Sequence, residues 1–249
     1  DVRTPTTATS NNNNPVHSFV GHHKAPITSL CFRTQSLQLF SACQDRCIRH
    51  FDLNEMLSVE TLYGHQADVT DVDCHWAQRP VSVGRDRTAR AWKLAEDTHL
   101  IFRAGSKISS AECVSCIKDS SFVTGHDDGH LALWFTTKKK MVASVQAAHG
   151  GSGGSGSGSS NSIAALDCLK GSDVAVSGSH DGYLRFWEVK TGPTAQERGL
   201  QALDTVPLHG YVNGLALGPD ARFCVAAVGQ EPRLGRWNRV PNAKNRIAI

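Results

Sequence analysis

Serine, histidine and aspartate residues recur at regular spacing in this chain, and together they are the residue types of a hydrolytic triad. The clearest copy combines Ser177 and Asp181 with an upstream His149, and Trp187 follows the acid. An enzyme needs such a triad once, whereas this set repeats along the chain. No Gly-x-Ser-x-Gly run lies where a strand is expected to turn into a helix. We therefore interpret the repeated residues as structural and expect no enzymatic activity.

The repeated unit has a fixed spacing that ends at an aromatic residue. An acid lies six positions before the aromatic residue, and a hydroxyl residue lies ten positions before it. The complete copies are Ser82/Asp86/Trp92, Thr124/Asp128/Trp134 and Ser177/Asp181/Trp187, and the degenerate copies are Ser41/Asp45/Phe51 and Ala227/Glu231/Trp237. Upstream of the five acids, in chain order of the units, lie His22, His65, Ser106, His149 and His209. The chain therefore contains five related units.

These residue types are able to form one hydrogen-bonded chain through a folded unit. A histidine ring, a carboxylate, a hydroxyl group and an indole N–H can satisfy one another where burial would otherwise be costly. We expect this network for His65, Ser82, Asp86 and Trp92 in the second unit. We expect the same network for the corresponding set in the fourth unit, which is His149, Ser177, Asp181 and Trp187.

A Gly-His near the start and a tryptophan at the end of units of about 40–45 residues is typical of propeller blades. In this respect the chain resembles the WD-repeat family. The resemblance implies an all-β propeller with five blades in this chain. Rings of this family usually have seven blades, so we expect two upstream blades that are missing or on another chain. Strands are also expected at residues 16–20, at 234–238 and, as an outer strand, at 247–249.

Composition divides the chain into three kinds of segment. Residues 1–15 are polar and are expected to form a disordered linker, and the blades are expected to span 16–249. Residues 151–160 consist only of Gly and Ser. We interpret this run as an engineered flexible linker within the propeller; a natural low-complexity loop is the alternative.

Cysteine usage and charge exclude several classes of site. The eight cysteines lack a pairing pattern and are expected to be reduced and buried. Cys113 and Cys116 lie three apart on an expected strand, where they face opposite sides, so we expect no metal site and no cofactor. No apolar run is long enough for a membrane span. The net charge of +3 is too small to indicate a nucleic-acid partner by itself.

The distribution of basic residues is more informative than their sum. No acid lies between Arg233 and Arg246, and the basic residues of this segment are Arg233, Arg236, Arg239, Lys244 and Arg246. Further basic residues lie in the turns of the first two units, at Arg46, Arg85 and Arg87. Both sets are candidates to contact RNA phosphates. The alternative is that they are solvated side chains that prevent edge-to-edge pairing.

The run from Val228 to Arg239, Val-Gly-Gln-Glu-Pro-Arg-Leu-Gly-Arg-Trp-Asn-Arg, is not part of the general repeat pattern. It resembles the WD-repeat subfamily that accompanies the U3 small nucleolar RNA, and Val83 to Leu94 is also similar to that subfamily. The resemblance implies a non-catalytic scaffold in the nucleus and nucleolus that binds the B/C box stem of U3 RNA. It implies as partners the kink-turn-binding protein of box C/D particles and other processome proteins.

A protein-only adaptor is the alternative function. It would bind a peptide or a partner protein at the mouth of the ring. The mouth would be lined by residues in or beside the repeat turns, which are Arg46, Arg85, Asp127, His180 and Gln230.

Overall fold

The structure is a computed structural model that describes residues 17–77, 79–105, 108–150, 161–192, 194, 196–233, 235 and 239–249. The predicted linkers at 1–15 and 151–160 lie outside these residues. The described part is all-β, with one 3-10 turn, η1 (Leu94–Glu96). No helix among the described residues is long and apolar enough to cross a membrane. The expected fold class is confirmed.

Four antiparallel sheets have four strands each, in chain order from the inside to the outside of the ring. Blade 1 contains β1 (Ile27–Phe32), β2 (Gln38–Cys43), β3 (Cys47–Asp52) and β4 (Leu57–Tyr63). Blade 2 contains β5 (Val69–Asp73), β6 (Val81–Gly84), β7 (Thr88–Lys93) and β8 (Thr98–Arg103). Blade 3 contains β9 (Ala111–Lys118), β10 (Ser121–His126), β11 (Leu131–Phe135) and β12 (Ala143–Val145). Blade 4 contains β13 (Ala165–Cys168), β14 (Val174–Gly178), β15 (Tyr183–Thr191) and β16 (Arg198–Pro207).

Blade 5 differs from the other sheets. It has three strands among the described residues, in the order β17 (Tyr211–Leu217), β18 (Cys224–Gly229) and β19 (Arg246–Ala248). The segment expected to be its outer strand therefore takes the third position, directly beside β18. The strand expected at 234–238 falls mostly outside the described residues. The strand expected at 16–20 is wrong for residues 17–20, which have no strand structure.

The core lies between the faces of neighbouring blades. Trp92 of blade 2 packs with Phe40 and Ile48 of blade 1, and Trp134 of blade 3 packs with Phe102 of blade 2. The inner strands β1, β5, β9, β13 and β17 contact one another in sequence around the ring. Apolar side chains at alternate strand positions thus bind each sheet to the next, which is how a propeller buries its faces.

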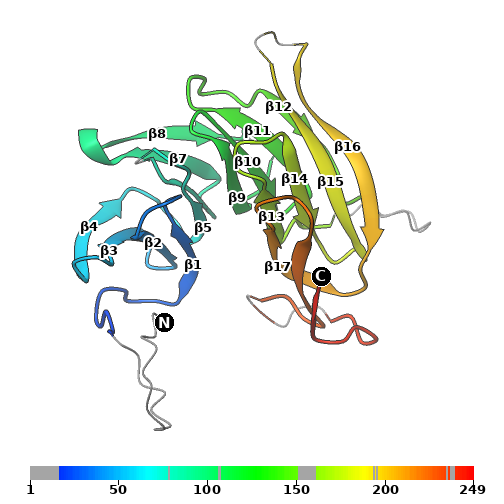
Figure 1. Ribbon diagram of the computed structural model, residues 1–249, viewed down its shortest axis with the longest axis horizontal. Coiled ribbons are helices and arrows are strands. Elements are labelled where there is room, and N and C mark those ends of the chain that lie inside the picture. Colours follow the sequence, from blue (N-terminus) through cyan, green and yellow to red (C-terminus); the bar gives the residue numbers. More distant parts are fainter. Residues whose placement is uncertain are drawn as a thin grey trace, which may run out of the picture.

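The two ends of this arc do not close on each other in Figure 1, where blade 1 and blade 5 are separated. Their outward faces carry apolar side chains in contact with solvent. Leu30 of β1 is 59% exposed, and Phe223, next to β18, is 50% exposed. A blade face of this kind is normally covered by another blade. The expected two additional blades remain a prediction that these open faces support.

Candidate functional site

The repeated network of blade 2 is buried and complete. His65 Nε2 lies 2.8 Å from Ser82 Oγ, and the indole Nε1 of Trp92 donates to the same oxygen at 2.8 Å. His65 Nδ1 lies 2.9 Å from Asp86 Oδ2. Burial alone would raise the pKa of Asp86, but His65 and the backbone N–H of Gln66 outweigh burial and hold this pKa well below its usual range. The ionised carboxylate thus belongs to the folded state.

Blade 4 repeats the arrangement across the Gly/Ser segment. His149 Nε2 lies 2.8 Å from Ser177 Oγ, and Trp187 donates to that oxygen at 2.8 Å. His149 Nδ1 lies 3.0 Å from Asp181 Oδ2, and Arg185 Nη2 lies at the same distance from this carboxylate oxygen. In blade 1, Arg49 pairs with Asp45 in the corresponding way. These arginines, two positions before the aromatic residue, therefore stabilise the blades.

Blade 3 obtains its histidine from an unexpected position. His126 Nε2 lies 2.9 Å from Thr124 Oγ1, which also accepts a bond from Trp134 Nε1 at 2.9 Å. Burial lowers the pKa of His126, so the ring is neutral at pH 7. Ser106, the residue that the repeat spacing places at the histidine position, lies outside the described residues. The carboxylate of Asp128 accepts a bond from Ser109 N instead.

We expect Thr124→Val to lower the free energy of unfolding by about 1–3 kcal/mol, because two buried nitrogens lose their partner while the side-chain volume is kept. Urea unfolding measures this change. Thr205→Val, on the exposed face of β16, is the control. A Thr124→Val variant as stable as the control would show that this hydroxyl is dispensable.

Blade 1 uses His23 and not the expected His22. His23 Nε2 lies 2.5 Å from Ser41 Oγ, and its Nδ1 accepts a bond from Arg49 Nη1 at 2.5 Å. Burial and, second, the charge of Arg49 lower the pKa of His23. The aromatic residue of this unit, Phe51, has no N–H to donate. In the fifth unit, the expected His209 is exposed to solvent.

The side chains of His23, Cys43 and Asp45 are the group among the described residues whose ligand atoms lie close enough for a metal ion, within 4.8 Å of one another. However, Arg49 Nη1 donates to both His23 and Asp45. A metal cation at this point would lie against a guanidinium group, so the donor set does not suit a metal.

The centre of the ring is a polar cavity lined by the inner strands. Asp71 accepts a bond from Val114 N at 2.9 Å, and Asp167 accepts one from Leu217 N at 2.7 Å, so that carboxylates connect neighbouring blades. Burial raises the pKa of Asp71 to about 6. Arg233, from the loop between β18 and β19, lines the same cavity. Its positive charge acts against this rise in the Asp71 pKa.

Arg233, predicted from the sequence to contact RNA, makes hydrogen bonds within the protein. Its guanidinium donates to the carbonyl of Thr28 at 3.0 Å and to that of Thr70 at 3.5 Å, which lie in blades 1 and 2. Its backbone N–H donates to Asn213. Arg233 therefore links the last blade to the first two across the ring, although part of its surface is exposed.

We expect Arg233→Ala to destabilise the protein more at pH 7 than at pH 5. Asp71 has a raised pKa, so its ionisation opposes folding as the pH rises through about 6. Loss of Arg233 raises this pKa further, and the added penalty develops only where Asp71 ionises. Urea unfolding at the two pH values measures the difference, with the exposed Arg222→Ala as control. A loss of stability that is equal at both pH values would contradict this coupling.

The other candidate RNA contacts lie at one end of the propeller. Arg46, Arg85 and Arg87 are exposed in the turns that join the second and third strands of blades 1 and 2. Arg239 and Lys244 lie in the loop between β18 and β19, and Arg246 begins β19. Because that loop also joins second and third strands, topology places all these residues at the same end, which we call the turn face. Arg239 Nη2 donates to Gln230 Oε1, and Arg236 lies outside the described residues.

Backbone geometry sets two of these arginines apart. The residue that follows the turn aspartate has a positive φ in four blades, and it is Arg46 (68°), Arg87 (60°), Gly129 (75°) and Gly182 (87°). This left-handed conformation is free of strain for glycine and costs an arginine about 1 kcal/mol or more. Blades 1 and 2 therefore have an arginine at a position whose backbone conformation favours glycine.

Comparisons with known proteins agree with this architecture. The WD domain, G-beta repeat family matches residues 13–52, 57–93 and 153–188. The U3 snoRNP-associated protein-like EMB2271 of Arabidopsis thaliana is 37% identical over 240 residues, which are 94% of this chain and 49% of that protein. The ribosomal RNA-processing protein 9 of Saccharomyces cerevisiae is 28% identical over 284 residues, covering 90% of this chain and 50% of the yeast protein.

Solved structures show the same relationship. A structure described as that of U3-55K superposes with a TM-score of 0.86 at 35% identity, covering 93% of this chain and 69% of that chain. The chain spans about half the length of the curated relatives it matches. On the repeat pattern, the blade networks and these similarities, the chain belongs to the WD-repeat family of β-propeller proteins, in which relatives are named U3 snoRNP-associated and ribosomal RNA-processing proteins.

Proposed function

We propose that this chain is a non-catalytic subunit of the U3 box C/D small nucleolar ribonucleoprotein that binds U3 RNA through its turn face. The names of the relatives, U3 snoRNP-associated protein and ribosomal RNA-processing protein, support the assignment to this particle. The observation that carries the RNA contact is the pair of left-handed arginines, Arg46 and Arg87, at positions where blades 3 and 4 have glycine. Strained backbone positions cluster at active and ligand-binding sites, which makes these two arginines the candidates for RNA contacts.

The mode of binding follows from the side chains of the turn face. The arginine and lysine side chains at this end match the phosphates of an RNA stem. A stem recognised by shape and phosphate contacts fits this surface best, such as the B/C box stem of U3. In this assignment the protein acts in pre-ribosomal RNA processing in the nucleolus, beside the kink-turn-binding protein and other processome proteins, and upstream blades complete its ring.

Binding of a labelled B/C box stem, measured by fluorescence anisotropy over a range of salt concentrations, tests the proposal. We expect the logarithm of the affinity to fall linearly with the logarithm of the salt concentration. We also expect an unrelated RNA stem of equal length to bind more weakly. Equal affinity for both stems, or no binding at low salt, would contradict the proposal. The alternative of a peptide in the ring mouth is less favoured, because Arg233 already lines the central cavity.

A further inference from the structure

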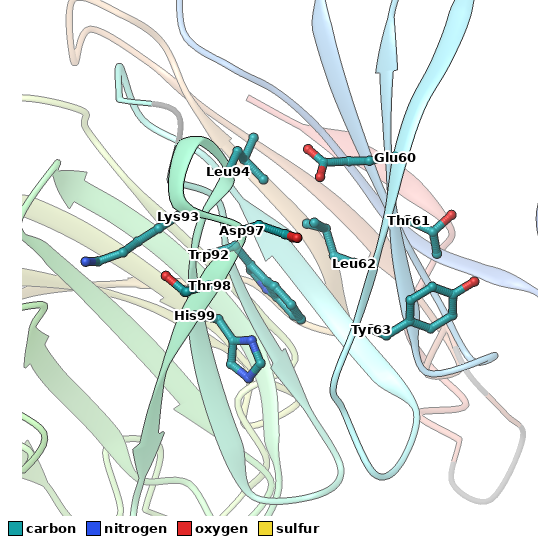
Figure 2. A pocket seen from close by; sticks show the side chains of 10 residues that line it. All are labelled: Glu60, Thr61, Leu62, Tyr63, Trp92, Lys93, Leu94, Asp97, Thr98 and His99. Carbon is teal, nitrogen blue, oxygen red and sulfur yellow. The ribbon is translucent and has the colours of Figure 1, made fainter.

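The outer strands of blades 1 and 2 form a second surface, distinct from the turn face. Blades 1 and 2 enclose a pocket of about 250 Å³ there, between β4 on one side and β7, η1 and β8 on the other. Its apolar lining includes Leu62, Leu94 and the indole of Trp92. Figure 2 shows these side chains between the two walls. Leu62 and Trp92 are buried and form the floor of the pocket.

Two carboxylates enter this pocket from opposite walls. Glu60 extends from β4 toward Leu94, and Asp97 extends from the end of η1 toward Leu62 (Figure 2). Among the described residues, Asp97 has no side-chain partner, and Glu60 contacts only His50, at 3.3 Å.

The other ionisable groups of the pocket do not offset these negative charges. Lys93 points away from the pocket in Figure 2 and pairs with Glu96 at 2.6 Å. His99 accepts a bond from Arg90, and burial together with Arg90 lowers the pKa of His99, which keeps its ring neutral. The Arg90 guanidinium beside His99 is itself paired with Asp86 at 3.8 Å, so the pocket carries the two negative charges of Glu60 and Asp97 above an apolar floor.

The strand beside the pocket has a free edge. Strand β4 is the last strand of its sheet and pairs only with β3 among the described strands. Its residues Leu57, Val59 and Tyr63 are all more than half exposed, and Tyr63 lines the pocket. An open edge with exposed apolar side chains is a template to which an extended segment of another protein can add.

From this combination we propose that the pocket binds one arginine side chain of a protein partner whose extended segment lies along β4. The aliphatic part of the arginine packs on Leu62 and Leu94. Its planar guanidinium lies between Glu60 and Asp97, with the indole of Trp92 close enough to contribute a cation–π interaction. The negative charge excludes RNA phosphates from this surface, so the partner here is a protein.

A short extended peptide with one central arginine, acetyl-Val-Thr-Arg-Thr-Val-amide, is the probe. We expect it to bind at millimolar concentration and to shift the NMR amide signals of β4 and of Thr98 and His99. The double variant Glu60→Gln/Asp97→Asn is expected to weaken binding at least about tenfold. The same peptide with citrulline, which has the shape of arginine without its charge, is expected to bind correspondingly weakly.

The control variant is Asp204→Asn, which removes an exposed acid from blade 4 and is expected to leave the affinity for the peptide unchanged. The proposal is overturned if the citrulline peptide binds equally well, if the double variant retains full affinity, or if neither peptide shifts these signals. The double variant is expected to keep its affinity for the RNA stem, so the outcome is independent of the proposed function.

Discussion

Replacement of Asp86 by alanine is expected to lower the free energy of unfolding by about 3–5 kcal/mol, the cost of removing one partner from a buried charged network. The Asp86 side chain is 5% exposed and that of its partner His65 is fully buried. The carboxylate accepts bonds from the N–H of Gln66 and of Thr88 and from the Thr88 hydroxyl. In the variant, the buried His65 ring and the buried Thr88 groups lose this acceptor, whereas the exposed Gln66 can turn to water. Asp86→Asn keeps one side-chain oxygen, so its free energy of unfolding is expected to lie between those of the wild type and Asp86→Ala.

The effect should depend on pH in a defined window. Because the folded protein lowers the Asp86 pKa, the carboxylate contributes stability above its unfolded pKa of about 4, and this contribution is lost as the pH falls below that value. Urea unfolding should therefore show a large difference between wild type and Asp86→Ala at pH 7 and a smaller one near pH 3. Asp127→Ala, an exposed turn aspartate of blade 3, is the control. A difference that stays constant with pH would show that packing, and not charge, explains the loss.

The repeat spacing, with the resemblance to the WD-repeat family that rests on it, predicts the architecture, because each blade needs the same few polar groups at the same places. The indole donates to the hydroxyl ten positions earlier in blades 2, 3 and 4, as the repeat implies. Those bonds arise within one hairpin of each sheet, and hairpin register follows directly from sequence separation.

The histidines were harder to predict, because they lie on loops whose length varies. In blade 1 two histidines are adjacent, and His23 lies 22 residues before Asp45, close to the 21 residues that separate His65 from Asp86. That signal was available in the sequence. In blade 3, His126 reaches the hydroxyl from the end of the same strand, two residues after Thr124. The repeat pattern does not predict a histidine two residues after the hydroxyl residue.

In blade 5 the repeat spacing does not predict the position of the third strand. Glu231 and Trp237 have the repeat spacing, but Ala227 offers no hydroxyl group to an indole. The third strand instead begins at Arg246, and the intervening loop carries Arg233 to carbonyls of blades 1 and 2. The residues that meet there lie 205 positions apart in the chain, a contact that ring geometry creates and local sequence does not encode.

The second large effect concerns Arg46 and Arg87, where function and stability should change in opposite directions. The double variant Arg46→Gly/Arg87→Gly relieves two left-handed arginines, so its free energy of unfolding should be unchanged or higher by up to about 1 kcal/mol per site. Its affinity for the B/C box stem should fall about 10–100-fold near 0.1 M salt. The slope of the salt dependence should fall by about 0.9 for each lost phosphate contact.

A matched control exists at the opposite end of the molecule. Lys139 and Lys140 are exposed in the loop between the third and fourth strands of blade 3, and strand direction places that loop away from the turn face. Lys139→Gly/Lys140→Gly removes the same charge and should leave RNA affinity almost unchanged. Equal losses in the two double variants would mean that net charge alone attracts RNA. Full affinity in the arginine variant would remove the turn face as the binding surface, because a strained side chain that contributes neither stability nor binding has no role there.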